Sequence, residues 1–173
     1  SSGIVDMLVP GLDNLYSIEI MRGVMEVLSR TDLRLALSVT HDTLQLEQYW
    51  LTKILNHGAT DGVILVLSHG QQQYFDTLRE HKVPFVVVDQ RGELGPDIPS
   101  VGATNWLGGR IATEHLISLG HRRIAIITGP LSLRCSQDRL AGYRAALGDA
   151  GIPVDPALIR SGAFQQETGY DQG

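Results

Sequence analysis

The fold of this chain is decided by residues 119–151, which read LGHRRIAIITGPLSLRCSQDRLAGYRAALGDAG. After a basic turn, residues 124–127 form an apolar block that is rich in β-branched side chains and too short for a helix. Such a block is typical of a buried parallel strand. Arg139 then opens a segment whose apolar residues share one helical face, and Gly151 ends it. The stretch predicts a strand, a loop and a helix that begins with an arginine.

The same alternation runs through the rest of the chain. Short apolar or alternating segments predict strands, and amphipathic segments between them predict helices. Strands are expected at 4–9, 33–40, 63–68, 84–88, 100–103, 124–127 and 158–161, and helices at 17–28, 44–57, 72–81, 106–119 and 139–151. Strands that alternate with helices in this way form βαβ units. The predicted fold class is therefore α/β, with parallel sheets covered by helices on both faces.

Two of these helices carry packing hypotheses. Gly23 lies inside the first helix, where a glycine costs about 1 kcal/mol relative to alanine, so we expect it to pack closely on the sheet. The pair Gly108-Gly109 lies near the start of the helix 106–119. A glycine pair alone is a weak phosphate-binding signal, so close helix packing is the favoured interpretation. The expected inner face of that helix consists of Leu107, Ile111, Leu116 and Leu119.

The pattern also predicts two lobes. Residues 1–120 form a first lobe of ordinary domain size. From His121 the pattern restarts, and residues 121–173 hold two predicted strands and one predicted helix. These elements are too few to bury both faces of a sheet. We therefore expect 121–173 to be the start of a second lobe that is truncated here.

Composition excludes several classes of protein. Of the 173 residues, 43% are hydrophobic and 19% are charged, which is typical of a soluble globular domain. No apolar run approaches the roughly 18 residues of a membrane span, and no signal peptide is recognisable. Cys135 is the only cysteine, so no internal disulfide forms and a cytoplasmic location fits. A net charge of −5 argues that this segment does not grip nucleic acid by itself.

Motifs of catalysis and cofactor binding are absent from the sequence. The chain contains no G-x-G-x-x-G after a strand, no phosphate-binding G-x-x-x-x-G-K-[ST] and no G-x-S-x-G. His115 and His121 have the wrong offset to share a helical face, and Cys135 lacks a histidine partner in the pattern. We therefore predict no catalytic residue, no cofactor and no metal site.

A ligand cleft is the remaining kind of site. In open α/β sheets, ligands bind over the carboxyl edge of the strands, where loops converge. Sugar recognition needs hydrogen-bonding side chains for hydroxyl groups and an aromatic face for the ring, and arginine supplies a planar fork of donors. The candidate ligand-binding residues are Asn14, Tyr16, Ser17, Ser68 and Asp89 in the first lobe, and Arg139 and Phe164 in the second.

Other interpretations of these residues stay open. Arg139 could cap a carbonyl or form an ion pair with Asp138 or Asp149. Phe164 could belong to the core, and Asn14 could form an Asx turn before its helix.

The segment GHRRIAIITGP at 120–130, followed by RLAGYRAAL at 139–147, resembles the effector-binding domain of the LacI/GalR family of bacterial transcription regulators. The resemblance extends over almost the whole chain and implies the fold of periplasmic sugar-binding proteins. It also implies roles for single residues. Arg139 matches the principal ligand-holding arginine, and Phe164 matches an aromatic residue that stacks on the ligand. The family's Asn-x-aromatic segment is matched by Asn14 and Tyr16, with Ser17 beside them, and its Asp-Gly-(Ile/Val)-Ile element by residues 61–64, with Ser68 at the pocket-facing end of the strand.

The sequence departs from the family pattern at two places. Thr104-Asn105 stands where many members have Asp-Asn, so no role of that aspartate transfers to this chain. Leu133 and Cys135 occupy loop positions that are polar in some relatives, which disfavours a purine-like ligand.

The resemblance leads to a functional hypothesis. The chain is expected to be the effector-binding region of a cytoplasmic transcription regulator. It would bind a small molecule, most simply a sugar, between two lobes. The signal would pass through a homodimer to operator DNA, which is held by a headpiece missing from this chain; no membrane partner is expected. Two alternatives are a secreted solute-binding protein of a sugar transporter and an enzyme of the same doubly wound class.

Overall fold

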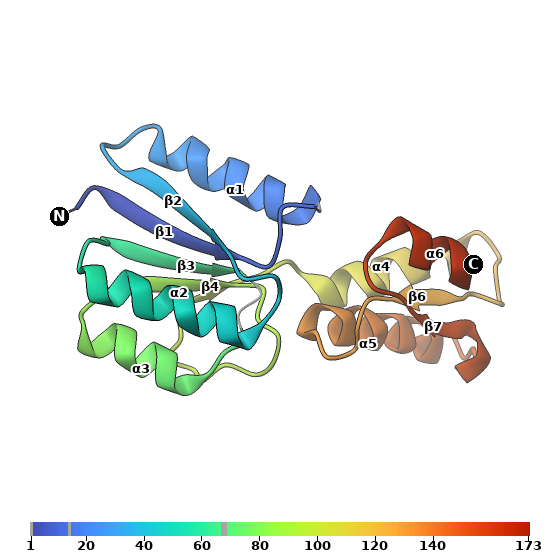
Figure 1. The fold of residues 1–173 in the computed structure, drawn as a ribbon. Helices are drawn as coiled ribbons and strands as arrows, with labels where there is room; N and C mark the ends of the chain where they lie inside the picture. The colour runs from blue at the N-terminus through green and yellow to red at the C-terminus, as the bar shows by residue number, and fades with distance from the viewer. Residues whose placement is uncertain (1, 14, 67–68) are drawn as a thin grey trace. The chain divides into compact units, whose positions relative to one another are not determined.

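The computed structural model describes residues 2–13, 15–66 and 69–173. The chain forms two compact units, Ser1–Val101 and Gly102–Gly173. Both units alternate parallel strands with helices, so the predicted α/β fold class is confirmed (Figure 1).

The first unit is built on a sheet of five parallel strands in the order β2-β1-β3-β4-β5. Its elements are β1 (Ile4–Val9), α1 (Leu15–Leu28), β2 (Arg34–Val39), α2 (Leu44–His57), β3 (Gly62–Val66), α3 (Gln72–Glu80), β4 (Phe85–Val88) and β5 (Ser100–Val101). The strand order reverses between β1 and β3, because β1 lies between β2 and β3. The loops that follow β1 and β3 therefore leave the carboxyl edge in opposite directions, which is where ligands bind in such sheets.

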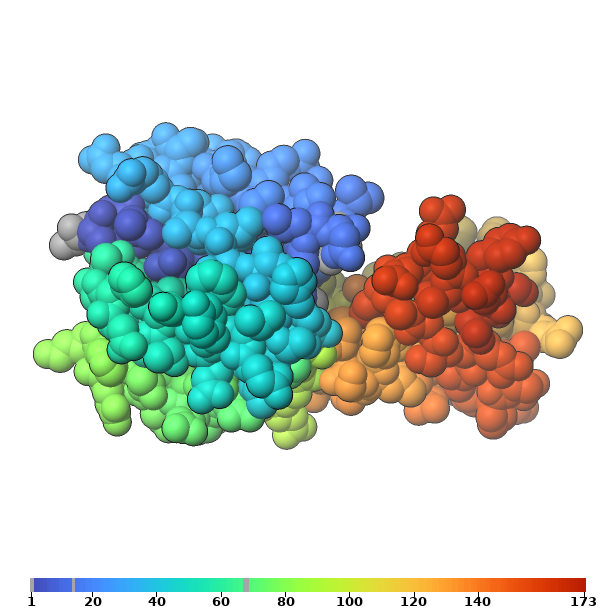
Figure 2. All heavy atoms as spheres, viewed as in Figure 1, coloured from blue at the N-terminus to red at the C-terminus, as the bar shows by residue number. Residues whose placement is uncertain are grey.

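Helices cover both faces of this sheet. Successive side chains of a strand point to opposite faces, so Met7 and Val9 pack with α1, whereas Leu8 packs with α2 and α3. Phe75 of α3 is 1% exposed and lies in the same cluster as Leu8. From the side shown in Figure 2, the side chains of α2 and α3 form a continuous surface over the strands. The first unit thus has a closed, two-sided core.

The second unit contains a smaller sheet, in which β6 and β7 pair in parallel. Its elements are α4 (Asn105–Ser118), β6 (Ile126–Thr128), α5 (Arg134–Asp149), the short 3₁₀ helix η1 (Pro156–Leu158), β7 (Ile159–Ser161) and α6 (Gln166–Gln172). Its core gathers Ile124, Leu140, Tyr143 and Leu147. The Tyr143 hydroxyl donates a hydrogen bond of 2.8 Å to the Ile124 carbonyl, and burial raises the pKa of this tyrosine.

Two glycines let α4 and α5 pack backbone against backbone. A Cβ atom at Gly142 would lie 2.0 Å from the carbonyl oxygen of Trp106, and one at Gly109 would lie 2.2 Å from that of Arg139. Neither position can hold a side chain without moving a helix. The predicted packing role is confirmed at Gly109, whereas a Cβ at Gly108 would meet nothing within 4 Å.

Because of this helix pair, the boundary between the units differs from the one expected from the sequence. The sequence placed the boundary at residue 120, but the structure divides the chain after Val101. The reason is that α4 packs on α5, which belongs to the second unit.

The face of α4 that we expected to be buried is exposed. Leu107 is 45% exposed and Ile111 is 54% exposed, and Leu116 and Leu119 are also exposed. The buried residues of α4 are Asn105 and Thr113, which share a face with Gly109. Because α4 approaches α5 through glycine, its small and polar side lies inward.

Three other expectations need correction. Helix α5 begins at Arg134, so Arg139 lies inside the helix rather than at its first residue. Helix α6 was not predicted. Gly23 is exposed and a Cβ there would meet nothing within 4 Å, so it makes no close contact with the sheet. Within the described ranges, no helix combines the length and apolar character needed to cross a membrane.

Candidate functional site

Two predicted residues of the first unit meet at the carboxyl edge of its sheet. Tyr16 comes from the first turn of α1, and Asp89 directly follows β4. The Tyr16 hydroxyl donates a hydrogen bond to the Asp89 carboxylate. Asp89 has a φ of 46°, in the left-handed region that is uncommon for non-glycine residues. Tyr16 is 38% exposed, so its ring remains accessible beside this carboxylate.

The other predicted residues of the first unit differ in placement. Ser17 is 0% exposed, so its side chain lies within the packed layer of α1 rather than on the surface. Asn14 and Ser68 lie outside the described residues.

Charged residues that the sequence analysis did not single out anchor the loops at this edge. Arg91 forms an ion pair with Asp42, which joins the loop after β4 to the loop after β2. Glu47 is 3% exposed and accepts a 3.1 Å hydrogen bond from the backbone N–H of His69. The sequence gives little sign of this contact. It places Glu47 in the first turn of α2, where a glutamate usually faces solvent.

The second unit brings Arg139 and Phe164 together. The guanidinium carbon of Arg139 lies 5.8 Å from the centroid of the Phe164 ring, within cation–π range. The ring occupies space that a side chain on residue 129 would fill, because a Cβ at Gly129 would lie 2.0 Å from it. Phe164 is 52% exposed and has a φ of 58°. A left-handed aromatic residue is strained, and such strain clusters at ligand sites.

Asn105 also holds Arg139, and sequence reasoning did not include it among the site residues. Nε of Arg139 donates a 2.8 Å hydrogen bond to Oδ1 of Asn105. Asn105 is the first residue of α4 and is 9% exposed. Its Nδ2 donates to the carbonyl of Ala103 at 3.2 Å. The two partners are 34 residues apart, so nothing in the local pattern announces the pair.

The carboxylates that could have neutralised Arg139 are bound elsewhere. Asp138 accepts a 2.8 Å hydrogen bond from Arg134, and Asp149 pairs with Arg110 at 2.7 Å. Glu114 and then Asp149 raise the pKa of Arg110. The alternative that Arg139 pairs with Asp138 or Asp149 is therefore wrong. Among the described residues, no carboxylate lies within ion-pair distance of Arg139.

A hollow of about 570 Å³ lies in the second unit beside this arginine. Its walls come from α4, β6 and α5, with Arg139 and Phe164 in the lining. Residues 124–129, which include β6, contribute six of the lining residues. Ser136 contributes a buried hydroxyl that has no hydrogen-bond partner in the described structure.

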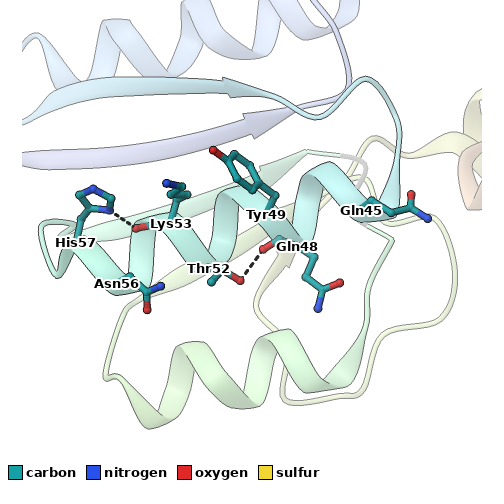
Figure 3. A pocket seen from close by; sticks show the side chains of 7 residues that line it. All are labelled: Gln45, Gln48, Tyr49, Thr52, Lys53, Asn56 and His57. Carbon is teal, nitrogen blue, oxygen red and sulfur yellow. Dashed lines mark hydrogen bonds between the residues drawn. The ribbon is translucent and has the colours of Figure 1, made fainter.

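A second hollow, of about 440 Å³, lies on the surface of the first unit. Figure 3 shows that its side chains all come from α2. The Lys53 ammonium lies 5.5 Å from the centroid of the Tyr49 ring. The hydrogen bonds drawn there, such as His57 Nδ1 with the Lys53 carbonyl, stay within the helix. This surface lacks the convergent polar groups of a binding site. In the described ranges, no cluster of His, Cys, Asp and Glu side chains is placed to hold a metal ion.

Comparison with known families gives one match over nearly the whole chain. A family model described as "Periplasmic binding proteins and sugar binding domain of LacI family" matches residues 2–172. The chain is 34% identical to the ribose operon repressor of Haemophilus influenzae over 167 residues, which are 95% of this chain and 49% of the repressor. The chain thus spans about half the length of the curated relatives it matches.

Solved structures agree with this match. A complex of the transcriptional regulator CelR with cellobiose superposes with a TM-score of 0.82 at 29% identity, covering 98% of this chain and 53% of that one. The transcription regulator CcpA of Lactococcus lactis superposes with a TM-score of 0.81 at 28% identity, covering 97% of this chain and 61% of that one.

Proposed function

Because the chain belongs to the family of periplasmic binding proteins and LacI sugar-binding domains, we propose that it is the ligand-sensing region of a DNA-binding transcription regulator. Its effector is a small molecule, and a sugar is the class that we propose. The observation that carries the proposal is Arg139, an arginine with no carboxylate partner among the described residues, held beside an exposed aromatic ring.

The chemistry of both residue sets suits a sugar. The Arg139 guanidinium offers donors to neighbouring hydroxyl groups, and the Phe164 ring offers a flat apolar face. In the first unit, the Tyr16 hydroxyl donates its proton to the Asp89 carboxylate, so this pair offers oxygen acceptors to the hydroxyl groups of a sugar. In the second unit, we propose that Arg139 and Phe164 contact the effector. In the first unit, we propose Tyr16, Asp89, Asn14 and Ser68 as effector contacts, whereas Ser17 is buried. One relative is named for a ribose operon and another forms a complex with cellobiose, which supports a sugar as the class of effector.

The regulatory part of the proposal concerns the whole protein. Effector binding shifts the balance between two conformations only if the effector binds them with different affinity. We propose that the shift passes through a homodimer to operator DNA, held by a part of the protein outside this chain. The relatives are named as repressors and regulators, which favours this role over a transporter's solute-binding protein or an enzyme. A regulator of this kind works on DNA, so a cytoplasmic location is part of the proposal.

We also propose that 102–173 is part of a larger lobe. In the described part of this unit, β6 pairs only with β7, which leaves its other edge unpaired, and the exposed Ile127 of β6 lines the hollow. A further parallel strand would cover this edge, which is otherwise a site for unwanted pairing. Amide exchange over 126–128 is expected to be slower in a longer chain of the parent protein. Equal exchange in both chains would contradict this proposal.

The effector proposal is tested by calorimetry on the full chain, with D-ribose, cellobiose and a panel of other monosaccharides. At least one sugar is expected to bind, and Arg139→Ala should weaken binding by about tenfold or more, since a hydrogen-bonded charge is lost. Arg144→Ala is the matched control, because Arg144 is an exposed arginine on the same helix; it should bind like wild type. A panel without a binder, or an Arg139→Ala variant of unchanged affinity, would rule out the assignment.

A further inference from the structure

The hydrogen bond between Asn105 and Arg139 has a consequence for ligand binding, which rests on the proposed function. A guanidinium has donors at Nε, Nη1 and Nη2. Asn105 accepts from Nε at 2.8 Å, and the described structure contains no partner for either Nη group. We propose that Asn105 is a positioning residue, which holds Nε so that both Nη groups of Arg139 are presented to the ligand.

Asn105 can hold Arg139 because it is itself held. Its side chain is 9% exposed, and its Nδ2 donates to the carbonyl of Ala103. It stands at the first residue of α4, whose distance from α5 is set by the glycine contacts at Gly109 and Gly142. The acceptor thus belongs to a rigid frame rather than to a loose side chain.

The other side of the guanidinium is limited by Phe164. Its ring lies 5.8 Å from the guanidinium carbon and rests where Gly129 leaves room. An arginine side chain that is free in solution samples many rotamers, and ordering them on binding costs affinity. Contacts from Asn105 and Phe164 order the side chain before a ligand arrives.

The amide of Asn105 differs from a carboxylate in one useful respect. An aspartate at this position would also accept from Nε, but it would neutralise the guanidinium. An asparagine orients Arg139 and leaves its positive charge available to the ligand. The two effects can be separated by comparing Asn105→Ala, which removes the acceptor, with Asn105→Asp, which keeps it.

The first arm of the test needs no ligand. In ¹⁵N NMR of the full chain, the Nε–H resonance of Arg139 is assigned by its loss in Arg139→Lys. Its exchange with water should be slow in wild type and in Asn105→Asp, and fast in Asn105→Ala. Asn56→Ala, which changes an exposed asparagine on α2, should leave it slow. An Nε–H that exchanges in wild type as fast as in an exposed arginine overturns the proposal, whether or not Asn105→Ala folds.

The second arm measures D-ribose affinity by calorimetry. Asn105→Ala should weaken binding about tenfold, and Asn105→Asp should weaken it less. An Asn105→Ala variant that binds like wild type, or that binds no worse than Asn105→Asp, overturns the positioning role. If wild type does not bind ribose, the same comparison is made with a sugar of the panel that binds. A panel without a binder rules out the sugar proposal, while the Nε–H exchange still decides the role of Asn105.

Discussion

The two units differ in how they make a core from the same kinds of element. The first unit covers a five-stranded sheet with α1 on one face and with α2 and α3 on the other. The second unit holds together mainly through two helices that meet at glycines, over a two-stranded sheet. Large apolar side chains stabilise the first, and the absence of side chains at two positions permits the second. We therefore expect large-to-small substitutions to destabilise the first unit and glycine-to-larger substitutions to destabilise the second.

Each unit has its own fluorescent reporter for this comparison. The chain has two tryptophans: Trp50 in α2 of the first unit and Trp106 in α4 of the second. A chain of two units need not unfold in one step, so a single free energy of unfolding is not assumed. Replacing either tryptophan with phenylalanine lets urea titration follow one unit at a time.

The largest effect is expected for a large-to-small change in the first unit. Phe75 is 1% exposed and stacks on Phe85 with the ring centroids 5.3 Å apart. Phe75→Ala should lower the free energy of unfolding reported by Trp50 by about 4 kcal/mol, through lost burial and a cavity. Met25→Ala, at a site 54% exposed in α1, should cost less than about 0.5 kcal/mol. Equal losses in the two variants would break the account of the first core.

A small-to-larger change should have the corresponding effect on the second unit. Gly142→Ala adds a Cβ that would lie 2.0 Å from the Trp106 carbonyl oxygen, and should lower the stability reported by Trp106 by about 3 kcal/mol. Gly148→Ala lies on the same helix, where a Cβ meets nothing within 4 Å. It should raise stability by roughly 0.5–1 kcal/mol, the gain from glycine to alanine in a helix. Opposite signs for the two alanines are the decisive result.

A smaller loss of stability is expected when a buried backbone carbonyl in the core of the second unit loses its hydrogen-bond donor. Tyr143 is 1% exposed, and its hydroxyl donates to the Ile124 carbonyl at 2.8 Å. Tyr143→Phe should cost about 1 kcal/mol in the Trp106-reported transition, because the carbonyl loses its donor. Tyr170→Phe, at a site 88% exposed, serves as the control and should change nothing measurable. A neutral Tyr143→Phe would mean that another donor replaces the hydroxyl.

The smallest effect concerns pH and the first unit. Burial raises the pKa of the Asp6 carboxyl above its ordinary 3.8, and a hydrogen bond involving Thr60 opposes the shift in part. An acid whose pKa is raised by folding costs stability as the pH climbs from 3.8 through the raised value. Asp6→Asn should therefore be more stable than wild type near neutrality, and the gain should vanish below 3.8. The Trp106-reported transition should not respond. A gain that persists in acid would contradict the burial argument.

The sequence predicted local elements well where their signals are local. The helix at 44–57 and the strand at 4–9 were predicted with the bounds that the structure has. For α2 the reason is visible in its caps, since Thr43 accepts from the Leu46 N–H and Gly58 has left-handed φ. Such capping depends on adjacent residues alone.

Elements whose packing is set by distant partners were predicted less well. The apolar residues of α4 suggested an inner face around Leu107 and Ile111. The contact through Gly109 and Gly142 instead buries the face that carries Gly109 and leaves Leu107 and Ile111 exposed. The same contact moved the unit boundary to Val101. No pattern along a single helix contains this information, because a glycine contact is defined by the backbone that approaches it.

The candidate site shows the same division. Residue types and the resemblance singled out Tyr16, Asp89, Arg139 and Phe164. Which of them meet depends on the fold, since Tyr16 and Asp89 are 73 residues apart. Asn105 was noticed only as part of a family pattern, because a buried amide near a helix start is usually read as a cap.

The glycine contact between α4 and α5 also restricts how this protein can diversify. A single substitution at residue 109 or 142 is not tolerated, because the new Cβ would clash with the backbone of the neighbouring helix. A change at Phe164 meets no backbone in this way, since its ring is half exposed and contacts the Arg139 side chain and the space above Gly129. A library of variants designed to change the ligand specificity of this domain should therefore keep Gly109 and Gly142 and randomise position 164.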